Sequence, residues 1–149
     1  NSGVRRRMKL DGFSIAEDFI AVVRGSERFD LHNDFDFQSL LFNSSQRILE
    51  LRWRRGLSEW VKPGQPSELS LSFHGVYLFK THERDSEMPF TEDSCVDTLG
   101  FIWDDLIAEM GFTSHQPGDG CNHFTAIFMS GFSIKVGAES VALHTAGGV

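Results

Sequence analysis

The chain has 149 residues, a formal net charge of −7 and 40% hydrophobic residues. A strongly acidic chain is repelled by nucleic acids and by anionic membrane surfaces, so we exclude both as partners. Because no run of about 18 apolar residues occurs, no transmembrane helix is expected. The aromatic residues comprise 14 Phe, three Trp and one Tyr. This bias predicts a core packed with Phe or, in a second interpretation, a Phe-lined cavity for an apolar ligand.

The N-terminal third of the chain predicts a tail followed by three strands. Residues 1–12 are polar and basic and indicate a flexible tail, so a single domain is expected over 13–149. Residues 19–24 favour a short strand, although their apolar spacing also fits a helix. Apolar residues predict strands at 35–42 and 47–54, which an Asn-Ser-Ser turn joins into a hairpin.

The segment 68–83, ELSLSFHGVYLFKTHE, predicts one long strand at the centre of a sheet. Apolar and polar residues alternate as far as His74, and Gly75 then interrupts the pattern. A glycine inside a strand often marks a bulge, and a bulge here places the apolar residues on both sides of it on one face. The residues expected to be buried on this face include Leu71, Phe73, Val76 and Leu78.

One amphipathic helix is predicted over residues 98–110, where apolar residues recur with helical spacing. Asp97 or Thr98 can cap its N-terminus, and Gly111 stands where a C-terminal glycine cap belongs. The apolar stripe consists of Leu99, Ile102, Trp103, Leu106, Ile107 and Met110.

The C-terminal part of the chain predicts a second hairpin. Residues 123–129 and 132–138 alternate apolar and polar side chains on either side of a Ser-Gly turn. A short last strand is expected at 140–144. Together these elements predict an α+β fold, in which a strongly curled antiparallel sheet of six or seven strands carries one amphipathic helix on a face.

The candidate metal ligands are His115, Cys121 and His123, which follow one another as H-x5-C-x-H beside a loop. Their spacing matches no standard zinc pattern and provides no fourth ligand, so we expect structural roles and neither a metal nor another cofactor. His32, Asp34 and Asp36 also stand at alternate positions, but their segment lacks the glycine at the sixth loop position and the closing glutamate of an EF-hand loop.

No catalytic residue is predicted, because no common nucleotide-binding or hydrolase motif occurs. Cys95 beside His74 or His82 could act as a nucleophile, but nothing in the sequence places either histidine next to it. The polar candidates for a small-molecule pocket are His74, Tyr77 and His82. The two cysteines fit a reducing environment and predict a cytoplasmic protein, although one disulfide stays open as an alternative.

The clearest electrostatic feature is the segment 83–109, which carries nine acidic residues and one basic residue, Arg84, for a net charge of −8. Such a segment is either a solvated face or a surface that attracts a basic protein partner. The residues predicted to bind this partner are Glu83, Asp85, Glu87, Glu92, Asp93, Asp104 and Asp105.

The order of RILELRW, a loop, ELSLSFHGVYLF, an acidic stretch and a closing hairpin resembles small uncharacterised bacterial proteins. Some of these are assigned as immunity proteins of toxin systems. The resemblance covers residues 35–80 and 123–144 and rests on the pattern of strands. It implies a β-rich binding protein that neutralises a toxin by covering the active site of that toxin.

We therefore expect a small cytoplasmic binding protein without catalytic activity, whose partner is a basic protein. The alternative is a small-molecule-binding, β-barrel-like domain or an enzyme with a Phe-lined pocket. A third interpretation is an oligomer that pairs through an exposed strand edge. A closed apolar pocket with convergent polar groups favours the alternative, whereas a flat acidic surface favours the protein partner.

Overall fold

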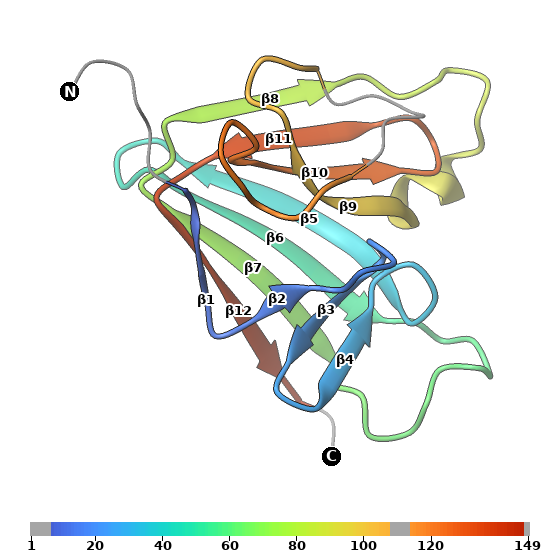
Figure 1. Ribbon diagram of the computed structural model, residues 1–149. Coiled ribbons are helices and arrows are strands. Elements are labelled where there is room, and N and C mark those ends of the chain that lie inside the picture. Colours follow the sequence, from blue (N-terminus) through green and yellow to red (C-terminus); the bar gives the residue numbers. More distant parts are fainter. Residues whose placement is uncertain (1–6, 108–113, 148–149) are drawn as a thin grey trace.

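Residues 7–107 and 114–147, which the computed structural model describes, form three β-sheets (Figure 1). The five-stranded sheet contains, in spatial order, β1 (Lys9–Asp11), β12 (Ser140–Ala146), β7 (Glu68–His74), β6 (Ile48–Arg55) and β5 (Phe35–Asn43). The four-stranded sheet contains β8 (Leu78–His82), β11 (Ser133–Gly137), β10 (His123–Phe128) and β9 (Val96–Ile102). The three-stranded sheet contains β2 (Ser14–Ile15), β3 (Ala21–Arg24) and β4 (Glu27–Asp30). A short 3-10 helix, η1 (Phe90–Ser94), precedes β9.

The predicted central strand is in fact two strands that belong to different sheets. β7 pairs with β6 and β12, whereas β8 pairs with β11. Between them the chain bends at Gly75, which has a φ of +67°. The partner strands β11 and β12 also pass from one sheet to the other beside this bend. His74, at the end of β7, lies opposite Ser140 of β12, and Leu78, at the start of β8, lies opposite Gly137 of β11. A bent two-stranded ribbon therefore joins the two larger sheets, whose strands cross at an angle in Figure 1.

The burial expected in this segment is confirmed except at Leu78, which is only half-buried. The residues confirmed as buried are Leu71, Phe73 and Val76. Gly75 leaves little room for a side chain, since an added Cβ atom would lie 2.6 Å from the carboxyl carbon of Glu139. The left-handed backbone and this close approach both favour glycine, and they mark a bend between sheets where a bulge was expected.

Phenylalanine rings fill the space between the two larger sheets. The ring centroids of Phe73 on β7 and Phe124 on β10 lie 5.0 Å apart, and those of Phe37 on β5 and Phe128 on β10 lie 4.8 Å apart. Trp53 of β6 is fully buried in the same core. Alternation along each strand turns these side chains inward, and their burial holds the sheets together.

Both predicted hairpins are confirmed, since β5 pairs with β6 and β10 pairs with β11 in antiparallel register. The strand expected at 19–24 is confirmed from Ala21 onward, as β3, and the last strand is β12. Residues 9–11, inside the range expected to be a tail, form β1 and pair in parallel with β12. Residues 1–6 of that range lie outside the described residues.

The prediction of a helix over 98–110 is wrong, and so is the α+β fold class that depends on it. The single curled sheet of six or seven strands is also wrong, because the described strands form three separate sheets. Residues 98–102 belong to β9, residues 103–107 are not helical, and residues 108–111 lie outside the described part of the chain. Trp103 and Ile107 of the expected apolar stripe are 44% and 64% exposed. β9 is buried on both faces, and such an apolar run cannot be told from a helix by periodicity alone. Nowhere in the described chain is a helix long and apolar enough to cross a membrane.

The three-stranded sheet is attached to both larger sheets. The carbonyl oxygen of Phe19, just before β3, accepts a hydrogen bond from the N–H of Leu99 at 2.8 Å and another from the hydroxyl of Thr98 at 3.2 Å. On the other side, the guanidinium of Arg24 donates to the hydroxyl of Thr145 on β12 at 3.1 Å. These bonds connect the small sheet to β9 and to β12.

Candidate functional site

The seven acidic residues predicted to bind a partner lie in two places. Those in the loop between β8 and β9, which includes η1, are Glu83, Asp85, Glu87, Glu92 and Asp93. Asp104 and Asp105 follow the far end of β9. Because β8 and β9 run in opposite directions, the loop lies at one end of the four-stranded sheet and the two aspartates follow the other end. At about 3.3 Å per residue, β9 separates the two groups by about 20 Å along the chain.

Asp104 has a structural role at its end of the sheet. Its carboxylate accepts hydrogen bonds from the backbone N–H of Asn122 at 2.7 Å and from the side-chain Nδ2 of the same residue at 3.1 Å. These bonds tie the segment after β9 to the residue that precedes β10. The structure therefore does not bring Asp104 and Asp105 together with the acidic loop.

Arg84 fixes the conformation of the acidic loop. Its Nε atom donates to the Asp93 carboxylate at 2.9 Å, and Nη2 donates to the carbonyl oxygens of Met88 at 2.8 Å and Pro89 at 3.1 Å. Although burial by itself raises the pKa of Asp93, hydrogen bonds from Ser130 and Arg84 hold that pKa below its usual value. Arg84, the one basic residue of the loop, thus binds groups of the loop itself. These bonds hold the loop in one conformation without a bound partner.

Phe90 extends into solvent from the same loop. Phe90 is 79% exposed, and the Cζ atom of Arg84 lies 4.6 Å from the centroid of its ring. This cation–π contact orients the ring. An exposed aromatic ring among carboxylates resembles the centre of a protein–protein contact, where aromatic side chains contribute most of the binding energy.

Acidic residues from other elements extend the loop into a larger surface. The pKa of the Cys95 thiol, just after η1, is raised by burial and then by the carboxylates of Glu92, Asp36, Asp97 and Asp30. Each of these carboxylates therefore acts on the surroundings of Cys95, and β5, which carries Asp36, contacts η1. The acidic surface is defined here as Glu83, Asp85, Glu87, Phe90, Glu92, Asp36 and Asp97. The alternate positions of Asp34 and Asp36 single out Asp36 in the sequence as a possible site residue. Only the tertiary fold, however, places β5, which carries Asp36, against η1.

Cys95 contacts His32, and not His74 or His82, the two histidines that the sequence suggested. The Sγ atom lies 3.6 Å from Nδ1 of His32, and the same nitrogen lies 2.5 Å from the carbonyl oxygen of Val96. A carbonyl oxygen only accepts, so Nδ1 carries a hydrogen and donates a hydrogen bond to the carbonyl oxygen of Val96. That nitrogen cannot take the thiol proton, and burial together with nearby carboxylates raises the thiol pKa. This geometry is not that of an activated nucleophile.

The three candidate metal ligands have structural surroundings. His115 forms a backbone bridge with β9, and its ring centroid lies 5.7 Å from that of Trp103. Cys121 is a buried free thiol, and buried His123 packs against Tyr77 with ring centroids 5.8 Å apart. In residues 7–107 and 114–147, no group of three or more His, Cys, Asp and Glu side chains could hold a metal ion.

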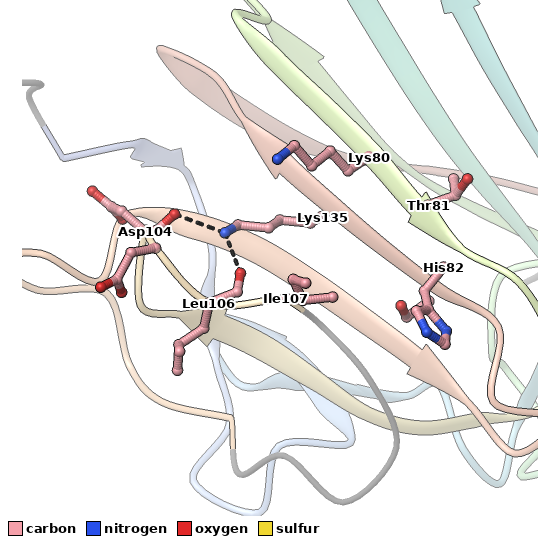
Figure 2. A pocket seen from close by; sticks show the side chains of 9 residues that line it. Lys80, Thr81, His82, Asp104, Leu106, Ile107 and Lys135 are labelled. Carbon is pink, nitrogen blue, oxygen red and sulfur yellow. Dashed lines mark hydrogen bonds between the residues drawn. The ribbon is translucent and has the colours of Figure 1, made fainter.

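The polar candidates for a small-molecule pocket do not converge. His74 is exposed at the end of β7, and Tyr77 is half-buried against His123. His82, at the end of β8, lines a surface pocket with other neighbours. This pocket has a volume of about 380 Å³ and lies between the outer face of β8 and β11 and the segment 104–107 (Figure 2).

Lys135 of β11 lies at the base of this pocket, although it is only 5% exposed. Its Nζ atom donates hydrogen bonds to the carbonyl oxygens of Asp104, at 2.8 Å, and Leu106 (Figure 2). Burial lowers the pKa of Lys135, and the nearby ammonium of Lys80 lowers it further. Lys135 is not among the residues predicted from the sequence, although a signal for it exists, because no other Lys, Arg, Asp or Glu occurs in residues 123–138.

A scan against protein-family models, a search among curated proteins and a search among solved structures each find no match for this chain. Its function is therefore inferred from the two surfaces described above, the acidic surface around Phe90 and the pocket around Lys135.

Proposed function

We propose that this protein binds a basic protein partner through its acidic surface and that it is a binding protein rather than an enzyme. The observation that carries the proposal is Phe90, which is 79% exposed on a loop whose conformation Arg84 fixes. A large ring held in water by a rigid loop offers apolar area that a partner can bury. Because the loop is already ordered, binding sacrifices little conformational entropy.

The charges around Phe90 determine which partner fits. Glu83, Asp85 and Glu87 are exposed and Glu92 is half-buried. None of these four carboxylates forms an ion pair with another described residue, so their charges can act on a partner. A cluster of negative charge accelerates association with a basic surface and slows association with an acidic one. An interface with an aromatic centre and a charged rim is the common arrangement.

A basic bacterial toxin is the first partner that we would test. The motive is the resemblance of the strand order to immunity proteins, which act by covering the active site of a toxin. We place this interaction in the cytoplasm. The two cysteines of the chain, Cys95 and Cys121, are both free thiols, which supports a reducing compartment.

The test uses wild-type protein, Phe90→Ser and Leu57→Ser as immobilised baits. Leu57 is 93% exposed and lies outside the acidic surface. Leu57→Ser is therefore the control, because it removes an exposed apolar side chain, as Phe90→Ser does, but at another place. Proteins captured from the source cells are identified by mass spectrometry, purified and returned to a binding assay. We expect a basic protein that binds wild type and Leu57→Ser, and that binds Phe90→Ser at least about tenfold more weakly.

A salt series then tests the charge. Association rates of the purified partner are measured with wild type and with a triple variant, Glu83→Gln, Glu87→Gln and Glu92→Gln, at about 0.02 M and about 0.5 M salt. The triple variant should associate more slowly at low salt, and the difference should nearly vanish at high salt. The proposal is wrong if Phe90→Ser binds as tightly as wild type, if the triple variant associates at the wild-type rate at low salt, or if no basic protein is captured.

A further inference from the structure

Two lysine side chains face each other across neighbouring strands beside the pocket of Figure 2. Lys80 of β8 lies directly opposite Lys135 of β11, and His82 lies opposite Ser133 two positions along. Residues two apart on a strand point to the same face, so both pairs occupy the outer face of the four-stranded sheet. The sheet thereby gathers two ammonium groups at one wall of a cavity.

Within residues 7–107 and 114–147, no carboxylate forms an ion pair with either lysine, Lys80 or Lys135. Like charges directly opposite on neighbouring strands repel each other. Nζ of Lys135 donates to two uncharged carbonyl oxygens, those of Asp104 and Leu106, and an ammonium group has three N–H donors. One donor therefore remains for a ligand, and an anion between the two ammonium groups would remove the repulsion.

The two aspartates that line the pocket do not supply this anion. The carboxylate of Asp104 is bound to Asn122 by two hydrogen bonds. Both carboxylates attract the ammonium of Lys135, but Asp105 is exposed and water weakens its attraction. The charge of Asp105 still opposes the entry of an anion, so removing this charge should strengthen anion binding.

We propose that this pocket binds a small organic phosphate, with the phosphate group between Lys80 and Lys135. A phosphate monoester carries close to two negative charges at neutral pH and accepts several charge-assisted hydrogen bonds, which suits two ammonium groups. The cavity of about 380 Å³ is larger than a phosphate group and falls in the range of small-molecule sites. The organic part then lies against Leu106 and Ile107, and it covers part of Ile107, which is 64% exposed.

Titration of the ¹⁵N-labelled protein with phenyl phosphate, followed by NMR, tests the proposal. Inorganic phosphate and benzoate are titrated in parallel, because the first lacks the organic part and the second lacks the second negative charge. We expect saturable shifts of amide signals on β8 and β11 with phenyl phosphate, and an affinity about tenfold higher than for either comparison ligand. Absence of saturable shifts up to about 10 mM phenyl phosphate, or equal affinity for benzoate, would overturn the proposal.

Three exposed positions provide variants that should leave the fold intact. Lys80→Gln should weaken phenyl phosphate binding about tenfold, whereas Lys62→Gln, at an exposed lysine outside this pocket, should leave it unchanged. Asp105→Asn should strengthen binding about twofold, because it removes the opposing charge. Wild-type affinity in Lys80→Gln, or equal weakening in Lys62→Gln, would assign the shifts to non-specific anion binding. Phe90→Ser should not change the affinity for phenyl phosphate, so this test is independent of the proposed binding of a protein partner.

Discussion

The ring of Phe73 packs against the ring of Phe124 with centroids 5.0 Å apart, and this contact joins the five-stranded sheet to the four-stranded sheet. We expect Phe73→Ala to lower the free energy of unfolding by about 3–5 kcal/mol, because it removes core contacts and leaves a cavity. Urea unfolding monitored by tryptophan fluorescence measures the change. The control is Phe90→Ala, at an exposed ring, which should cost no more than about 1 kcal/mol. Equal costs for the two variants would contradict the core position of Phe73.

The bend at Gly75 predicts a specific cost for alanine. Gly75 and Gly25 have similar left-handed backbones, with φ of +67° and +60°, but only at Gly75 would an added Cβ atom meet another group, the side chain of Glu139. Both alanine variants should lose about 1–2 kcal/mol of stability from the backbone conformation. Gly75→Ala should lose more, and adding Glu139→Ala should recover the excess. Denaturant unfolding of the three variants decides this, and no recovery in the double variant would rule out the steric explanation.

Asp93 should make stability depend on pH in acid. Burial raises the pKa of Asp93, but hydrogen bonds from Ser130 and Arg84 lower it by more, so the folded-state pKa lies below the unfolded-state value of about 4. The contribution of Asp93 to stability is therefore complete above pH 4 or so and is lost as the pH falls through the folded-state pKa. Arg84→Met should raise the pKa of Asp93, as followed by NMR of its carboxyl carbon. Arg52→Met, which breaks an ion pair elsewhere, should leave the Asp93 titration unchanged.

Cys95 should react slowly with alkylating reagents despite its contact with His32. Burial and neighbouring carboxylates raise the thiol pKa, so the thiolate is scarce near pH 7.5. We expect iodoacetamide to modify Cys95 more slowly than it modifies glutathione under the same conditions, as measured by mass spectrometry over time. His32→Gln should not slow the reaction further. Faster modification than glutathione, together with a decrease in His32→Gln, would instead show an activated cysteine.

The sequence by itself determined which neighbouring strands pair and which residues form the core. The two hairpins, β5 with β6 and β10 with β11, were predictable because alternation and a short turn are encoded within about twenty neighbouring residues. The burial of Phe73 and the need for glycine at position 75 were predictable for the same reason. The acidic character of the loop after β8 was also evident, since charge can be read from composition.

Only the tertiary structure decided how these pieces combine. β9 resembled a helix because both its faces are buried, and burial on the second face comes from residues distant in the chain. The bend at Gly75 looked like a bulge because the sequence of one strand does not reveal which sheet its continuation joins. The contact between Arg84 and Phe90 is local, but other contacts join residues far apart in the sequence. His32 lies beside Cys95, 63 positions away, and Lys80 of the proposed pocket lies opposite Lys135. Such contacts arise from strand order and register, which depend on the packing of the whole chain.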